Sequence, residues 1–375
     1  MRHDFGNVPA HRGGRHRQCG RVLGQTLHMK KHLLTAIQLL VTIGLLFWIF
    51  RNPEQNRKML EALDVANEWW LLPGLIALGG GLLLQAMRWR ILLEVQSIAI
   101  SYWRSLRILL VGMFFNLFLL GATGGDIIKI FLIMREAPDK KAGALLSVFI
   151  DRVVGVLALA AVSAVVILLR WQDLMAHEVT RYGVATAALI LGGSMGFVVV
   201  AWLAGRFHLA AKLPRWLPAH DKLVEAAGAF VEYARAGGSV GKAFLLSIPA
   251  HLLMFSTFWF GAKAFGAGLN LLSIYCVMPI VATVTALPIS IGGAGLREGL
   301  FIQILGALYA TPESIATLVS LSGFMMQVFW SLIGGVIYLG YRTSQKMPLG
   351  EMENAVDALE RRIEQNLEQG RNPGA

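Results

Sequence analysis

The stretch ALPISIGGAGLREGLF, residues 286–301, interrupts one of the most apolar parts of this chain. It places a proline, four glycines, an arginine and a glutamate within sixteen positions. The apolar flanks are typical of membrane helices, whereas the proline and glycines break the helix between them. Backbone that leaves its helix in hydrocarbon loses hydrogen-bond partners, so a break survives only where protein or a water-filled cavity satisfies it. The stretch therefore predicts a polar chamber inside a membrane domain.

The composition of the chain places it in a membrane. It has 375 residues, of which 55% are hydrophobic and 15% charged, and its mean hydropathy is +0.58. An ordinary soluble domain is about a quarter charged. We therefore expect an all-α polytopic membrane protein with about eight transmembrane helices. The apolar runs near the length of a bilayer crossing cover residues 33–50, 70–87, 145–169, 184–205, 243–265, 271–287 and 315–341.

The basic residues indicate orientation and exclude one class of partner. The net charge of +11 comes from Lys and Arg in short segments between hydrophobic runs, as topology signals are distributed, so nucleic acid is not an expected partner. Their excess in the N-terminal tail and from Arg342 onward predicts that both termini are cytoplasmic. The segment MKKHLL from Met29 looks like the start of an inner-membrane protein, so we expect a multi-pass protein of the bacterial or archaeal cytoplasmic (inner) membrane. Cys19 and Cys276 form no metal or disulfide spacing, and we expect no metal or other cofactor.

The charge distribution also predicts that one hydrophobic segment does not cross the membrane. If residues 108–123 spanned it, the basic segment 124–141 would be external, and every later loop would invert against the positive-inside rule. A re-entrant dip that turns around Gly121–Gly125 removes this conflict. We therefore expect re-entrant, glycine-broken helical segments beside the full crossings.

Three regions follow from these patterns. Residues 1–28 have no apolar period and are expected to form a disordered basic tail. Residues 29–342 form the transmembrane domain, in which 206–242 includes an interfacial helix on the cytoplasmic face. Residues 343–375 are expected to form a cytoplasmic amphipathic helix and tail.

A second broken segment resembles the first in its order of features. FNLFLLGATGGDIIKIFL, residues 115–132, also runs from an apolar helix through a glycine pair into a helix that opens with charge. The charges are Asp126 and Lys129 here, and Arg297 and Glu298 in the later break. Paired interruptions in the two halves of a chain indicate a transporter site and leave open an inverted repeat.

The residues around the two breaks are the candidate site. A helix that starts at a break directs its free N–H groups into the cavity, which suits a phosphate or carboxylate. We expect Asp126 to be the N-cap of the returning helix and Arg297 to donate to the ligand, with Glu298 orienting or pairing with it. The candidates for a lipid headgroup cavity are Asn116, Gly124, Gly125, Asp126, Lys129, Asp151, Arg152, Gly292, Gly293, Gly295, Arg297 and Glu298.

Asp151 and Arg152 are included because of their depth. They lie about 12 Å along a helix from Gly143, too deep for the membrane interface. Ionisable groups at such depth are costly unless they are paired and face protein or water. Because adjacent helical residues do not face each other, we expect each to have a different partner, with Asp126 and Lys129 as candidates.

A purely structural reading of these residues stays open. The glycines would then only permit tight turns, and Lys129 and Glu298 would reach the interface by snorkelling. Asp151 would form a static interhelical salt bridge, and Asn116 an interhelical hydrogen bond. Arg88 reads first as an interfacial anchor at the end of a span.

Three motifs together resemble a known family. They are FNLFLLGATGGDIIKIFLI (115–133), ALLSVFIDRVVGVLAL (144–159) and LPISIGGAGLREGLF (287–301). In this order they resemble the flippase-like membrane region of lysylphosphatidylglycerol synthases, which also occurs alone in many bacterial and archaeal proteins. The resemblance covers nearly all of residues 33–342, and departs at Leu120 and Lys129, where the family often has proline and arginine.

The resemblance implies a protein that moves, or helps to move, a phospholipid or related polar lipid between leaflets. Its partners would be that lipid and a separate lipid-modifying enzyme. In full-length synthases a soluble aminoacyl-transferase domain follows this region and attaches lysine to phosphatidylglycerol. Here the chain ends about 34 residues after Tyr341, so we do not carry that activity over.

Three functions are therefore compared. The first is a flippase-like translocase of an anionic lipid, and the second an accessory lipid-binding subunit of a lipid or cell-envelope synthase. The third is a membrane-embedded lipid-glycan enzyme that uses Asp126 or Asp151 as base or metal ligand. Since the sequence carries no P-loop, zinc-ligand helix or nucleophile elbow, we expect the protein not to be an enzyme.

Overall fold

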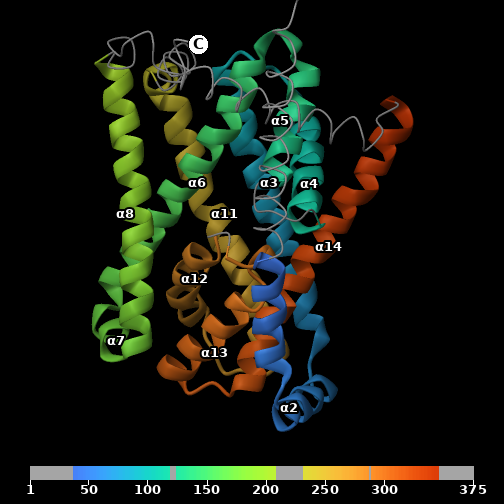
Figure 1. Cartoon of the computed structure of the whole chain (residues 1–375), viewed down its shortest axis with the longest axis vertical. Coiled ribbons are helices and arrows are strands. Elements are labelled where there is room, and N and C mark those ends of the chain that lie inside the picture. The colour runs from blue at the N-terminus through green and yellow to red at the C-terminus, as the bar shows by residue number, and fades with distance from the viewer. Residues whose placement is uncertain (1–36, 119–123, 208–230, 287–288, 346–375) are drawn as a thin grey trace, which may run out of the picture.

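The computed structural model describes residues 37–118, 124–207, 231–286 and 289–345, and every regular element in these ranges is helical (Figure 1). This confirms the predicted all-α class. The apolar helix Ile37–Phe50 comes first. The remaining elements are α2 (Pro53–Asp64), η1 (Glu68–Trp70), α3 (Leu71–Val95), α4 (Tyr102–Phe118), α5 (Gly124–Glu136), η2 (Pro138–Lys140), α6 (Lys141–Leu169), α7 (Trp171–Ala176), α8 (Glu178–Arg206), α11 (Gly237–Ala264), α12 (Leu271–Thr285), η3 (Ile291–Gly293), α13 (Leu296–Tyr309) and α14 (Glu313–Gln345).

Two of the predicted regions cannot be compared with the structure. The tail 1–28 and nearly all of the segment 343–375 lie outside the described residues, as does most of the interfacial helix expected within 206–242.

Long apolar helices confirm a polytopic membrane protein. In the described part of the chain, four helical segments are long and apolar enough to cross a bilayer. Large apolar side chains cover their outer faces, as a lipid environment requires: Ile76, Leu168, Leu245 and Val336 are 64–76% exposed. The four segments are Glu68–Val95, Gly143–Leu169, Gly237–Ala264 and Glu313–Gly340.

The first broken segment forms a hairpin of short helices. α4 has 17 residues and α5 has 13, and they pack against each other in the upper half of the view in Figure 1. α4 ends at Phe118 and α5 begins at Gly124, so the helices are interrupted where the glycine-rich stretch was predicted to turn. The hairpin therefore agrees with the re-entrant dip that the charge distribution predicted.

The second broken segment forms a similar hairpin at the other end of the molecule. α12 and α13 have 15 and 14 residues and occupy the lower half of the view in Figure 1. At 1.5 Å per residue α12 is about 22 Å long, whereas the hydrocarbon core is about 30 Å thick. α12 alone is therefore too short for the full crossing predicted over residues 271–287, because the helix ends at Thr285 before the break.

The two hairpins lie at equivalent positions in two sets of four helices. Each set consists of a long helix, two short helices and a second long helix. The sets are α3–α4–α5–α6 and α11–α12–α13–α14, and corresponding helices run in opposite directions (Figure 1). Their internal contacts correspond: α3 packs on α4 and α6, as α11 packs on α12 and α14. The contact of α5 with α6 likewise corresponds to that of α13 with α14. This arrangement is the inverted repeat that the paired breaks left open.

The two sets join along a central pair of helices, α3 and α11. A methyl group on Gly81 of α3 would lie 3.2 Å from the carbonyl oxygen of Ala250 in α11, so glycine permits this close approach. Trp89, also on α3, is fully buried and packs with α4, α5 and α6 side chains such as Val111, Ile128 and Val148. The α3–α11 pair thus provides the rigid support for both hairpins.

Candidate functional site

The start of α5 is held by a side chain of the preceding helix. Asn116 Oδ1 of α4 accepts a hydrogen bond of 2.8 Å from the backbone N–H of Gly125. A methyl group on Gly125 would lie only 2.0 Å from the carbonyl oxygen of Gly112, so the two helices touch where neither residue has a side chain. Asn116 therefore makes the interhelical hydrogen bond that the structural reading of this residue predicted.

Asp126 does not cap α5, which corrects the prediction made for it. The helix begins two residues earlier, at Gly124, and Asp126 belongs to its first turn. Its two carboxylate oxygens accept hydrogen bonds of 2.9 and 2.8 Å from the guanidinium of Arg152 on α6. Because Gly124 and Gly125 already allow the chain to enter the helix, the carboxylate is free to form this pair.

A buried cluster of three charged residues lies beside that pair. Arg88 Nε of α3 donates to Asp151 Oδ1 of α6 at 2.8 Å, and Lys129 Nζ of α5 lies 3.5 Å from Asp151 Oδ2. All three residues are at most 6% exposed. As expected, the neighbours Asp151 and Arg152 therefore have different partners. We call Arg88, Lys129 and Asp151 the buried triad.

Two further contacts fix the cations of the triad. Arg88 also donates to Ser247 Oγ of α11 at 3.2 Å, which ties the triad to the second set of helices. The ammonium group of Lys129 lies 4.4 Å from the ring centroid of Trp89, a cation–π distance. The triad holds two cations for one carboxylate, so it has an excess of one positive charge at membrane depth.

The prediction that Arg88 is an interfacial anchor was wrong. Its position near the end of a span suggested an interfacial anchor, but the structure buries it against Asp151. The side chain of Arg90, two residues further along α3, is 42% exposed and pairs with Glu94 on the same helix. Two positions that are two residues apart lie on different faces of a helix, so only one of the two arginines can face the core. The sequence around them does not show which one does.

The glycines of the second break adopt backbone conformations that other residues avoid. Gly292, Gly293 and Gly295 have φ angles of 59°, 77° and 79°. A methyl group on Gly295 would also lie 2.4 Å from Cβ of Leu45 in the first helix. The glycines therefore make the tight turn between α12 and α13 and let the first helix approach it.

Arg297 and Glu298 form a second, closed charge cluster at the start of α13. The Arg297 guanidinium donates to Glu298 Oε1 at 2.7 and 3.1 Å, and Ser320 Oγ of α14 donates to the same oxygen at 2.8 Å. Glu298 Oε2 accepts from the backbone N–H of Gly295 at 2.6 Å. Both charged residues are buried. Glu298 was predicted either to orient Arg297 or to pair with it, and the structure shows the pair.

The second break approaches the end of α4 in the first hairpin. η3, in the second break, contacts α4 of the first hairpin. A methyl group on Gly292 would lie 3.7 Å from Cδ1 of Leu117, near the end of α4, and 4.0 Å from Phe324 of α14. Among the side chains that the structure describes, no hydrogen bond or ion pair joins the buried triad to the Arg297–Glu298 pair. The end of α4 and the second break therefore meet through apolar contact, and each hairpin has its own cluster of charged residues.

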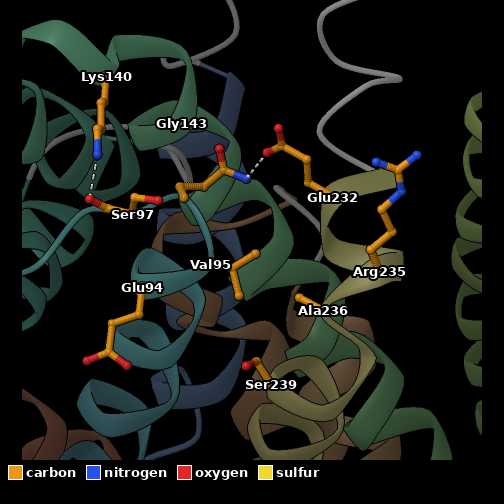
Figure 2. A pocket seen from close by; sticks show the side chains of 10 residues that line it. Glu94, Val95, Ser97, Lys140, Gly143, Glu232, Arg235, Ala236 and Ser239 are labelled. Carbon is orange, nitrogen blue, oxygen red and sulfur yellow. Dashed lines mark hydrogen bonds between the residues drawn. The ribbon is translucent and has the colours of Figure 1, made fainter.

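A polar pocket of about 690 Å³ lies elsewhere, at the end of α3 beside the first turns of α6 and α11 (Figure 2). Gln96 donates to Glu232 at 3.1 Å and Lys140 to the carbonyl oxygen of Ser97 at 2.6 Å, both marked in Figure 2. None of the predicted site residues lines this pocket. Its lining residues are Glu94, Val95, Gln96, Ser97, Lys140, Gly143, Glu232, Arg235, Ala236 and Ser239.

The helices, their inverted arrangement and the buried charges define a class, a multi-pass α-helical membrane protein with two re-entrant hairpins. A family model, the lysylphosphatidylglycerol synthase TM region, matches residues 35–334. The chain belongs to this family, as the three motifs predicted. A search of curated proteins finds no match for the chain.

Proposed function

We propose that this protein is a flippase-like translocase that moves an anionic phospholipid or a related polar lipid between the two leaflets. The observation that carries the proposal is the pair of re-entrant hairpins from opposite ends of the molecule, in which the second break contacts the end of α4 and each hairpin holds buried charges. In transporters of this architecture, sites lie near the bilayer midplane where broken helices of two inverted repeats meet.

The charge of the buried triad supports an anionic substrate. A charge within a membrane span is costly unless it is paired. The triad has two cations, Arg88 and Lys129, for one carboxylate, Asp151. A phosphodiester carries one negative charge and accepts several hydrogen bonds, so it would balance the excess. A zwitterionic headgroup would leave the excess unbalanced.

The proposal requires no chemical step by this chain. Moving a headgroup across the membrane needs polar contacts along the way and a change in access from one side to the other. The Arg297–Glu298 pair is neutral as a unit, so it adds no net charge at the second break. We therefore propose a transport role rather than an enzymatic one.

Reconstitution of the full chain tests the proposal. Proteoliposomes of phosphatidylcholine with a minor fraction of phosphatidylglycerol would contain fluorescently labelled phosphatidylglycerol or phosphatidylcholine, and dithionite quenching would report transbilayer movement. We expect the protein to accelerate movement of the anionic probe above that in protein-free vesicles. Lys129→Gln removes the excess charge while leaving the Arg88–Asp151 pair intact, and should slow this movement by about tenfold or more.

A matched variant controls for the loss of an arbitrary basic residue. Arg170, just after α6, forms a partly exposed pair with Asp173 at 2.7 Å, away from the buried triad, so Arg170→Gln should leave the rate unchanged. No movement by the wild-type protein would refute the proposal. Binding of the probe without movement would favour the accessory lipid-binding subunit, and chemical conversion of the lipid would favour an enzyme.

A further inference from the structure

One charged side chain of the first hairpin region is exposed although it lies deep in the membrane. The Arg152 side chain is 55% exposed, whereas its partner Asp126 is 18% exposed. Arg152 lies about 13 Å along α6 from Gly143, the first residue of that span. Asp126 lies about 15 Å along α5 from its last residue, Glu136. Two independent helices therefore place the pair at about the same depth.

The guanidinium cannot reach the interface from this position. Long basic side chains in membranes usually extend along the helix until their charge meets water. Arg152 instead donates two hydrogen bonds, of 2.8 and 2.9 Å, to the carboxylate of Asp126. The bidentate pair fixes the cation at depth, and its exposed side then faces a medium in which an unsatisfied donor is costly.

The surroundings of Arg152 on α6 are apolar and exposed. Leu145 and Phe149 are each 40% exposed and precede Arg152 by seven and three residues, which places all three on one face of the helix. A single cation within an exposed apolar stripe matches an amphiphile, since hydrocarbon chains would lie along the stripe while an anionic group meets the guanidinium.

The pair also borders the buried triad. Asp126 precedes Lys129 by three residues on α5, and Arg152 follows Asp151 on α6, so each member of the exposed pair is adjacent to a member of the triad. A phosphate that replaced Asp126 as the partner of Arg152 would therefore lie about one helical turn from Lys129.

We infer that Arg152 is the lateral docking position at which the phosphate of an anionic lipid is first bound from the bilayer, with Asp126 as the competing carboxylate that it displaces. This inference rests on the proposed function and adds the side from which the lipid arrives. It assigns opposite roles to the two members of one salt bridge: Arg152 attracts the phosphate and Asp126 opposes it.

The opposite roles give a test that a merely structural salt bridge would fail. In the proteoliposome assay, the initial rate of movement of labelled phosphatidylglycerol is measured against the mole fraction of unlabelled phosphatidylglycerol, with labelled phosphatidylcholine as the neutral probe. Arg152→Gln should lower the initial rate by about tenfold, the effect of losing a charge-assisted hydrogen bond. Asp126→Asn should instead lower the mole fraction of unlabelled phosphatidylglycerol that half-saturates the site.

Two further variants guard against loss of folding. Arg152→Lys keeps the charge without the bidentate geometry and should give a rate between those of wild type and Arg152→Gln. Arg170→Gln, just after the same helix, should behave as wild type. If Asp126→Asn leaves unchanged or raises the mole fraction that half-saturates the site, or if Arg152→Gln slows both probes equally, the docking position is refuted while the proposed function stands. If wild type moves neither probe, the proposed function itself fails.

Discussion

Asp151 is the residue on which the buried triad depends. Its carboxylate contacts both Arg88 and Lys129, so a neutral side chain at this position leaves two buried cations without a counter-ion. Removal of one partner from a buried ion pair costs about 3–5 kcal/mol. We therefore expect Asp151→Asn to destabilise the folded protein by about this amount, measured as the free energy of unfolding in a mild detergent.

The control for this prediction is an ion pair of the same residue types at the surface. Asp173 pairs with Arg170 at 2.7 Å, and its side chain is 55% exposed. Exposed pairs contribute about 0–1 kcal/mol, so Asp173→Asn should change the free energy of unfolding by no more than that. Equal losses in the two variants would contradict the picture of a buried, mutually dependent triad.

For individual residues, the sequence indicated which charged side chains lie inside the membrane domain, but not which of them pair with each other. Asp151, Arg152 and Lys129 stood out because ionisable residues within apolar runs are costly. Which partner each would take depends on the helix packing, which brings α3, α5 and α6 together. The contributions of Arg88 and of Ser320 therefore became visible only in the structure.

The α4–α5 hairpin depends on the absence of side chains at its contact. A methyl group on Gly125 would meet the Gly112 carbonyl oxygen at 2.0 Å, and a backbone atom cannot move aside as a side chain can. Overpacking of this kind costs about 1–3 kcal/mol. Gly125→Ala should therefore lower the free energy of unfolding by about this amount and disturb the hydrogen bond from Gly125 to Asn116, as thermal unfolding of the purified protein would show.

A glycine elsewhere in the molecule provides the comparison. Gly192 lies within α8, and a methyl group there would meet nothing within 4 Å. Alanine is favoured over glycine in a helix by about 1 kcal/mol, so Gly192→Ala should be neutral or stabilising. If both substitutions destabilised the protein alike, the close approach of α4 and α5 would not be the cause.

The two hairpins were not equally predictable from sequence. The first was expected to be re-entrant because the basic segment 124–141 would otherwise lie on the wrong side. The segment between α12 and α13 in the second hairpin contains no Lys or Arg that would indicate a side of the membrane. In addition, α12 belongs to an apolar run that is nearly long enough to cross the bilayer. The glycines marked the break correctly, but charge counting could not show that the chain turns back there.

The whole molecule has two ends that the sequence assigns to opposite sides of the membrane. α2 lies at the end of the molecule opposite to the connection between α5 and α6 (Figure 1). In a background without Cys19 and Cys276, an impermeant thiol reagent should label Glu61→Cys in intact cells and Asp139→Cys only in inverted vesicles. Labelling of both positions from one side would contradict the arrangement of α3 as a complete crossing between them.

Each hairpin is built from short helices that start at one end of the molecule and stop near the middle. α5 and α13 are about 20 Å and 21 Å long, so their reach is fixed by the number of residues rather than by the membrane. In a bilayer of longer acyl chains the two faces move apart, and the mismatch has to be absorbed by tilting or by local thinning. Lipids with longer acyl chains would therefore strain the contact between Gly292 and Leu117 unless the helices tilt or the bilayer thins around the protein.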